Sequence, residues 1–231
     1  MELLEQLRYF TVLDGFAVGL LLLSWVILGH VIESPPKSRI STSVIMADYR
    51  RKWMVQMITR QPRIFDAAVL DTLRQGTAFF ASACMIAIGG GLATISNTER
   101  LRGVAQDLTI DVPEIIWEVK IFVALIFITS AFLKFIWANR LFGYCGVVMA
   151  SVPNEINAPE ALPRAKKAGE LNIAAARAFN RGLRSIYFAL GALGWFLGPI
   201  GLIATTFLTV FILVRREFAS ASREVLLQDE T

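Results

Sequence analysis

Three charged side chains, Asp14, Lys120 and Lys134, interrupt or border stretches that are otherwise apolar. A charge inside hydrocarbon is costly, so it is considered first as part of an ion path or a binding site. The two lysines are 14 residues apart, which places them within about 40° of one another on an ideal helix. They could be two stations of one polar pathway, and Asp14 could pair with Lys120 near the same membrane face.

The same three residues also have a structural explanation. The apolar stretch between the lysines, residues 121–133, covers about 20 Å of helix. Lysines near opposite interfaces can extend their aliphatic stems and keep the ammonium group in water. A carboxylate at the depth of the interface needs no special role. We therefore expect Lys120 and Lys134 to mark the two interfaces of one span, with the polar pathway as the alternative.

A second group of candidates lies where apolar stretches end and is predicted at the cytoplasmic membrane interface. Its members are Arg50, Arg51, Lys52, Arg140, Asn180, Arg181 and Arg184. Basic pockets between helices on this side bind anionic lipid head groups. The same charges also serve as a plain topology signal, so head-group binding is one of two interpretations.

Signatures of enzymes and metal sites are not recognisable in this sequence. It has no G-x-S-x-G turn, Walker loop or H-E-x-x-H motif. His30 is the single histidine, and no second His or Cys stands at ligand spacing, whereas metal sites usually need several ligands. Three methionines near residue 50 are better explained by packing than by copper. We expect no catalytic residue, metal or cofactor.

Four long apolar stretches predict the elements that carry these residues. The chain is 55% hydrophobic and 18% charged, with a mean hydropathy of +0.55, which is too apolar for an ordinary soluble domain. A membrane span needs about 20 apolar residues. We predict an all-α membrane protein, with residues 1–231 as a single integral membrane domain. Its four transmembrane helices are expected at about 12–33, 76–96, 114–138 and 183–214.

The segments between these spans are predicted to be helical and cytoplasmic, at residues 34–75 and 139–182. Within the first, Met46, Tyr49 and Trp53 recur at three- and four-residue spacing, which indicates an amphipathic helix. This helix could lie in the membrane interface or pack on the next cytoplasmic helix. The first span is expected to be retained rather than cleaved, because no basic leader or cleavage site accompanies it.

Glycine and proline predict how two of the spans pack. Ala83, Ala87 and Gly91 are spaced by four, which forms a small-residue stripe suited to close helix contact. Gly198-Pro199 falls near the middle of the fourth apolar stretch. We expect a kink there, because proline removes an internal hydrogen bond of the helix.

The distribution of basic residues predicts the orientation. Lys and Arg number eight in residues 33–76 and six in 139–183, against one in 1–13, two in 97–117 and three in 215–231. Short cytoplasmic loops carry the excess of Lys and Arg, so both termini are expected outside the cytoplasm. A nucleic-acid partner is not expected, because the basic residues flank spans instead of forming one patch.

Several blocks of the sequence resemble a known family. NRGLRSIYFALGALGWFLGPIGLIATTFLTVFILVRREFAS (180–220) is similar to the C-terminal signature of the domain-of-unknown-function 599 family. FIWANRLFGYCGVVMASVP (135–153), YRRKW (49–53) and PRIFDA (62–67) resemble its other blocks. The residues that match the C-terminal motif are Asn180, Arg181, Arg184, Tyr187, Trp195, Pro199, Arg216 and Phe218. Gly143 departs from the family pattern, which has an asparagine before Tyr-Cys.

The resemblance implies a polytopic membrane protein of bacteria and plants, and it supplies no activity, substrate or catalytic residue. With the charge distribution, it leads us to expect a multi-pass protein of the bacterial inner membrane with both termini in the periplasm. The expected partners are the lipid bilayer and either further copies of the chain or other membrane-protein subunits.

Three functional hypotheses follow from these observations. The first is a non-enzymatic protein that acts by assembly, as a homo-oligomer or as an accessory subunit of a larger membrane complex. The second is a small-ion channel or transporter, with Asp14, Lys120 and Lys134 facing an oligomeric pore. The third is an anionic-lipid-binding protein that uses the basic residues at the inner interface.

Overall fold

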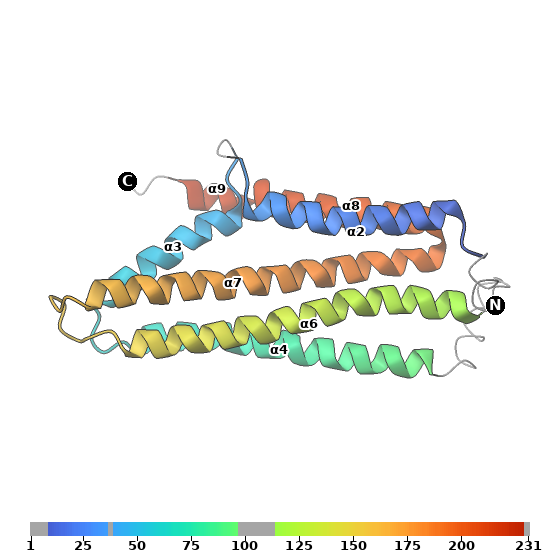
Figure 1. The fold of residues 1–231 in the computed structure, drawn as a ribbon. Coiled ribbons are helices and arrows are strands. Elements are labelled where there is room, and N and C mark those ends of the chain that lie inside the picture. The colour runs from blue at the N-terminus through green and yellow to red at the C-terminus, as the bar shows by residue number, and fades with distance from the viewer. Residues whose placement is uncertain (1–8, 37–38, 97–113, 229–231) are drawn as a thin grey trace. The chain divides into compact units, whose positions relative to one another are not determined.

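The computed structural model describes residues 9–36, 39–96 and 114–228, and within these ranges all regular structure is helical. The predicted all-α class is therefore confirmed for the described residues, and the predicted outer loop at 97–113 lies outside them. Figure 1 shows the helices α2 (Val12–Glu33), α3 (Thr42–Met57), α4 (Ile64–Ile95), α6 (Glu114–Ala150), α7 (Ala161–Ala192), α8 (Pro199–Phe218) and α9 (Ala221–Leu227). A 3-10 helix, η2 (Leu193–Leu197), lies between α7 and α8.

Four helical stretches are long and apolar enough to cross a membrane. They are Val12–Glu33, Ile64–Ile95, Ile115–Ala150 and Pro199–Leu227. The first three overlap almost completely with the spans predicted at 12–33, 76–96 and 114–138, so a multi-pass membrane protein is supported. The helices α4 and α6 continue well beyond the predicted spans, and the cytoplasmic location of these extensions stays a prediction.

Contacts divide the chain into two compact units. Unit 1 comprises α2 as far as His30, α4 from Ala83, α6 as far as Ala131, and Leu183–Val214. Unit 2 comprises Val31–Ser82, Phe132–Gly182 and the chain from Arg215 onward. The long helices α4, α6 and α7 therefore contribute residues to both units, as do α2 and α8 near one of their ends.

In unit 1, aromatic rings pack between the helices, and one glycine allows two of the helices to approach closely. Phe127 of α6 meets Trp25 of α2 edge-on, with ring centroids 5.3 Å apart, and stacks on Phe188 of α7 at 6.2 Å. On α4, a Cβ added at Gly91 would lie 2.6 Å from the Leu125 side chain of α6. Glycine is therefore what allows α4 and α6 to approach so closely at this level.

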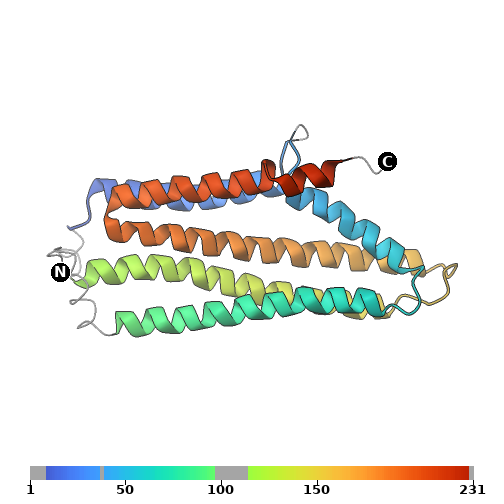
Figure 2. The same cartoon turned by 180° about the vertical axis from the view of Figure 1, so that it is seen from behind.

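The last part of unit 1 turns back on itself. Thr205 Oγ1 donates a hydrogen bond of 2.7 Å to the carbonyl oxygen of Gly191, although 14 residues of continuous helix would separate them by about 21 Å. The turn ends at Gly198, whose φ of 92° favours glycine, and Pro199 then opens α8 in the position where its fixed φ suits a helix. The helices α7 and α8 thus form an antiparallel hairpin, visible in Figure 2.

This hairpin replaces the single kinked span that we expected over residues 183–214. A proline within a helix bends it, but a positive φ just before the proline ends the helix altogether. A second glycine then allows α8 to pack closely after the reversal, because a Cβ added at Gly194 would collide with Thr205 of α8. Only glycine leaves room for α8 at this point.

Small side chains of α7 form the core of unit 2. Its buried alanines lie three, four or seven residues apart, so they fall on one narrow face of α7. The core comprises these alanines together with side chains of α3, α4 and α6: Ala161, Ala165, Ala168, Ala175 and Ala178, with Met54, Met57, Ile58, Leu70, Ala138, Leu141, Phe142, Cys145, Met149 and Val152. Among the residues that predicted the apolar face of α3, Trp53 is half-buried and Met46 is exposed.

The C-terminal tail belongs to unit 2 and packs on the start of α3. Glu217 accepts hydrogen bonds from the backbone N–H of Ser43 (3.1 Å) and from its hydroxyl (3.0 Å), while Arg223 Nε donates to the carbonyl of Ile40 (2.9 Å). The charge distribution had placed the tail and segment 34–75 on opposite sides of the membrane. Their direct contact follows from the hairpin, because α8 runs back along α7 instead of continuing in the same direction.

Candidate functional site

In unit 1, the side chains of Asp14 and Lys120 both lie beside the indole ring of Trp195. Trp195 Nε1 donates a hydrogen bond of 2.7 Å to Asp14 Oδ1, and the Lys120 ammonium lies 5.9 Å from the Trp195 ring centroid and 5.5 Å from that of Trp117. Asp14 is 7% exposed and Lys120 9%. Lys120 is thus buried beside two aromatic faces, an arrangement that stabilises a cation, whereas a snorkelling side chain would reach outward.

The Asp14 carboxylate is held by local bonds as well. Its Oδ2 accepts from the backbone N–H of Thr11 (2.9 Å) and from its hydroxyl (2.6 Å), and the Thr11 hydroxyl in turn accepts from the N–H of Asp14 (3.2 Å). These reciprocal bonds cap the first turn of α2. The carboxylate therefore ties the start of α2 to η2, which is a structural role that needs no transported ion.

Lys134 belongs to the other unit. It lies on α6 within unit 2 and is half-buried. Although it shares a helix with Lys120, the two lysines belong to different compact units. The polar pathway that would use both of them stays a hypothesis.

The seven residues proposed for a head-group site are not brought together into one ring. Arg184 belongs to unit 1 and is buried, and the other six belong to unit 2. Each of the six has a contact of its own: Arg50 with Asn172, Arg51 with Glu170, Lys52 with Asp48, Arg140 with Tyr144, Asn180 with Ser43 and Arg181 with Glu33. Within the described chain, most of these side chains join helices to one another. Arg51 and Lys52 line a common pocket.

This pocket, called here the α3–α7 pocket, has a volume of about 870 Å³. It is lined by Tyr49, Arg51, Lys52, Trp53, Val55, Gln56, Arg60, Lys166 and Glu170. A contact at its edge fixes α3 beside the first turns of α7, because Arg51 Nε donates to Glu170 Oε1 at 2.7 Å. That hydrogen bond raises the pKa of Arg51, so the guanidinium stays charged.

The α3–α7 pocket combines cations with aromatic and aliphatic walls. Its lining has four basic side chains and a single carboxylate, Glu170. The Lys52 ammonium lies 5.1 Å from the centre of the Tyr49 ring, and the ring of Trp53 adds a second flat apolar surface. Such a lining suits a ligand that carries both a negative charge and an apolar part.

A buried carboxylate that the sequence did not point out positions two of the lining residues. Asp66, in the first turn of α4, accepts a 2.7 Å hydrogen bond from Trp53 Nε1 and pairs with the Arg60 guanidinium through the same oxygen. Asp66 is 0% exposed, and its second oxygen has no partner among the described residues. An acidic residue in a first helical turn was the available signal, but it did not reveal these partners.

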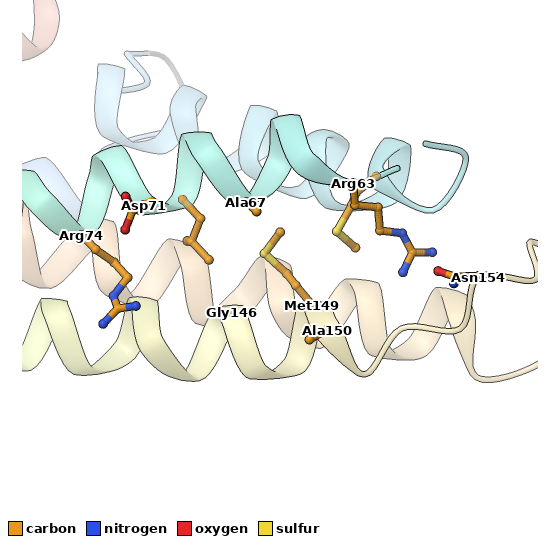
Figure 3. A pocket seen from close by; sticks show the side chains of 10 residues that line it. Arg63, Ala67, Asp71, Arg74, Gly146, Met149, Ala150 and Asn154 are labelled. Atoms are coloured by element: carbon orange, nitrogen blue, oxygen red, sulfur yellow. The ribbon is translucent and has the colours of Figure 1, made fainter. Parts of the chain in front are cut away.

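A second pocket, of about 460 Å³, lies between α4 and α6 (Figure 3). Small side chains on both helices, Ala67, Gly146 and Ala150, leave the space open. Figure 3 shows Arg63 extending toward the loop that carries Asn154. Its two terminal nitrogens donate to the carbonyls of residues 152 and 153, at 2.6 and 2.7 Å. Arg63 therefore fastens this loop.

Arg50 of unit 2 is half-buried beside the hydrophobic core. Arg50 donates to Asn172 Oδ1, and the amide of Asn172 lies 3.7 Å from the sulfur of Cys145. Asn172 and Cys145 are fully buried. Burial lowers the pKa of Arg50 from its usual value, yet arginine stays protonated in proteins. This network joins α3, α7 and α6 and leaves Arg50 outside the α3–α7 pocket.

Metal ligands do not gather in the part of the chain that the structure describes: no group there of three or more His, Cys, Asp or Glu could hold an ion. His30 is exposed at the end of α2. The expected absence of a metal or cofactor stays a prediction.

Comparison with known proteins gives a family match over most of the chain. The family model described as "Protein of unknown function, DUF599" matches residues 16–222. No curated protein and no solved structure matches the chain. A functional assignment therefore has to come from the chain's own residues.

Proposed function

Since the chain belongs to the DUF599 family, whose function is unknown, we propose from its own geometry that it is a non-enzymatic multi-pass membrane protein that acts by assembly. It associates with further copies of itself or serves as an accessory subunit of a larger membrane complex. The bilayer and these membrane proteins are its partners.

The observation that carries this proposal is an uncovered stripe of small residues on the apolar part of α4. Ala83 and Ala87 are exposed, and a Cβ added at Gly90 would meet no atom within 4 Å. Spacings of four and three residues put all three on one side of the helix. Membrane helices pack together through such small residues, because they let backbones approach closely.

Gly91, the third residue of the stripe expected from the sequence, is already used within unit 1, where it faces Leu125 of α6. The uncovered stripe therefore lies beside the face of α4 that packs on its own chain. A helix from another chain could occupy it without displacing a contact of unit 1.

Disulfide cross-linking in membranes tests this proposal. Ala87→Cys, in a chain carrying Cys84→Ala and Cys145→Ala, should form a covalent dimer on oxidation, through a disulfide between the introduced thiols of two copies. A different subunit would be cross-linked where it presents a cysteine of its own at the stripe. Met85→Cys is the matched control, because Met85 is also exposed on α4 but lies about 160° away around the helix. A protein that stays monomeric in blue-native gels and shows no cross-link from the stripe would overturn the assembly proposal.

We further propose an orientation in the bacterial inner membrane in which the C-terminal tail is cytoplasmic and the start of α2 is periplasmic. This orientation requires the end of α7 to cross the membrane beside the four apolar stretches, because four crossings alone would put both ends of the chain on one side. The contact of Glu217 with Ser43 supports it, because the tail then shares a side with segment 34–75. The three basic residues of 215–231 join the eight and six of the two cytoplasmic segments, which makes seventeen on that side against three on the other. This agrees with the positive-inside rule better than two periplasmic termini do.

Fusion of reporters to the C-terminus tests the orientation. Green fluorescent protein should fluoresce there, because it folds in the cytoplasm, and alkaline phosphatase at the same position should be inactive. The reverse pair of results would show that the tail is periplasmic and would contradict the proposed orientation.

The channel hypothesis draws on one specific observation, the two buried charges Asp14 and Lys120 of unit 1. Charged groups buried among membrane helices often mark ion paths. Planar-bilayer recordings of the purified protein test this alternative. Conductance that disappears with Lys120→Met would support it, and silent membranes across lipids and voltages would count against it.

A further inference from the structure

We propose that the α3–α7 pocket binds an anionic phospholipid, with the phosphate group near Lys52 and Lys166 and the start of an acyl chain against Tyr49, Trp53 and Val55. This inference stands apart from the assembly proposal, because it rests on unit 2 alone. It concerns a pocket made by two helices that are far apart in the sequence.

The pocket is large enough to hold part of a phospholipid. A volume of about 870 Å³ falls within the range of ligand sites, roughly 300–1,000 Å³. It suits a phosphate with its glycerol and the adjoining part of one acyl chain, and the rest of the lipid would extend out through the open side. A bare phosphate ion would leave most of this volume unfilled.

Two lysines of the pocket, Lys52 and Lys166, can contact the phosphate group of the lipid. Lys166 forms no ion pair with any described residue, so its ammonium is available to an incoming anion. Lys52 lies 3.8 Å from Asp48, and both side chains are more than half exposed. Such exposed pairs are weak because water screens them. The weak Lys52–Asp48 pair would therefore rearrange at little cost around a phosphate at the rim, and the phosphate would gain cationic partners.

The apolar side chains of the pocket favour a lipid over other anions, because they can contact an acyl chain. Trp53 is held by its hydrogen bond to Asp66 (2.7 Å), so its ring is fixed before any ligand arrives. Val55 is 36% exposed, an aliphatic side chain of α3 that a hydrocarbon chain would cover. Trp and Tyr beside basic side chains are also the residues that contact lipids at the membrane interface.

Native mass spectrometry of the full chain in mild detergent tests the proposal, with phosphatidylglycerol, phosphatidylcholine and inorganic phosphate as the added probes. Phosphatidylglycerol should remain bound. Phosphatidylcholine should bind with an affinity at least about tenfold lower, a difference that one charged contact can produce. Equal retention of the two lipids would overturn the proposal. So would inorganic phosphate that displaces the lipid completely, because the acyl chain would then contribute nothing.

Paired variants locate the site. Lys166→Glu should weaken retention of phosphatidylglycerol roughly tenfold, whereas Lys167→Glu should leave it unchanged, because Lys167 is an exposed neighbour outside the pocket lining. Val55→Asp should weaken it similarly, whereas Val44→Asp, at a valine of α3 with nearly the same exposure (37%), should not. All four positions are on the surface, and circular dichroism checks that the variants fold. If Lys166→Glu and Lys167→Glu retain lipid equally, the lipid is not bound in this pocket.

Discussion

Unit 1 places two charged side chains in one buried cluster around Trp195, whereas unit 2 distributes its charged side chains over many contacts, from Arg51–Glu170 to Arg223 on the carbonyl of Ile40. In unit 1, the cation and the carboxylate are shielded by indole rings and local hydrogen bonds. In unit 2, most pairs are partly exposed. The difference shows that a charge among apolar helices must be compensated within its own cluster, while charges near water can form weaker and more numerous links.

The two units also differ in how their helices approach one another. In unit 1, aromatic rings fill the centre and single glycines allow the closest contacts, as at Gly91 and Gly194. In unit 2, the alanine face of α7 packs against Met54 and its neighbours. On α2 of unit 1, Leu23 and Val26 remain 61% and 62% exposed. Those apolar surfaces suit lipid, as expected of a helix that crosses a membrane.

The largest effect is expected from Asp14→Ala in unit 1. This change leaves the Trp195 N–H without its acceptor and the buried Lys120 ammonium without a negative charge in its cluster, which should lower the free energy of unfolding by about 3–5 kcal/mol. Thermal or denaturant unfolding in mild detergent measures it. Asp71→Ala is the control from unit 2, because Asp71 is exposed and, among the residues that the structure describes, accepts a side-chain hydrogen bond from Gln75 alone. Equal losses in the two variants would contradict the contrast between the units.

An intermediate effect is expected from Asp66→Ala, which removes the most buried carboxylate of unit 2. The free energy of unfolding should fall by about 1–3 kcal/mol, because the N–H of Trp53 loses its acceptor. The loss should be smaller than for Asp14→Ala, since the Arg60 side chain is 38% exposed and can turn to water. Trp53 fluorescence, measured in a chain whose other four tryptophans are replaced by Phe, should also shift. No spectral shift would show that Trp53 does not depend on Asp66.

Two glycine substitutions compare the packing of the units directly. Gly194→Ala should destabilise unit 1 by about 1–3 kcal/mol, because the new Cβ collides with Thr205. Gly169→Ala in unit 2 should be neutral or stabilising by up to about 1 kcal/mol, since its Cβ would meet Met54 at an ordinary 3.6 Å and alanine favours the helix. Unfolding curves of the two variants provide the comparison. Destabilisation by both would mean that unit 2 is packed as tightly as the hairpin.

The smallest effect is expected from Arg51→Gln, which removes an exposed ion pair of unit 2. Because the Arg51 and Glu170 side chains are 51% and 60% exposed, the free energy of unfolding should fall by less than about 1 kcal/mol. The effect should diminish further at high salt. A large loss that salt does not reduce would show that this pair is a main link between α3 and α7.

Much of the fold could be predicted from the sequence, because its signals are local. The apolar stretches around residues 12–33, 76–96 and 114–138 predicted the helices α2, α4 and α6. The fourth stretch was misjudged for a physical reason. Hydropathy reports whether a residue suits a membrane helix, and it does not report whether the chain reverses within an apolar run.

The candidate site could be predicted only in part. Arg51 and Lys52 were singled out by charge and position, but Lys166 and Arg60, which line the same pocket, were not. The other members of the predicted basic group turned out to have separate partners, such as Glu33 for Arg181. Charge on one segment shows that a surface is basic, and only the packing of α3 against α7 shows which charges share a space.

The sequence by itself determined the class of this protein: an apolar, helical, multi-pass chain of the DUF599 family with its basic residues gathered in a few segments. These properties depend on composition and on the spacing of residues that are close together in the sequence. Only the tertiary structure decided that α8 returns along α7, that the tail rests on Ser43, and that Lys120 lies beside Trp195. Each of these depends on contacts between residues at least 14 positions apart, where the backbone angle of a single glycine can reverse the chain.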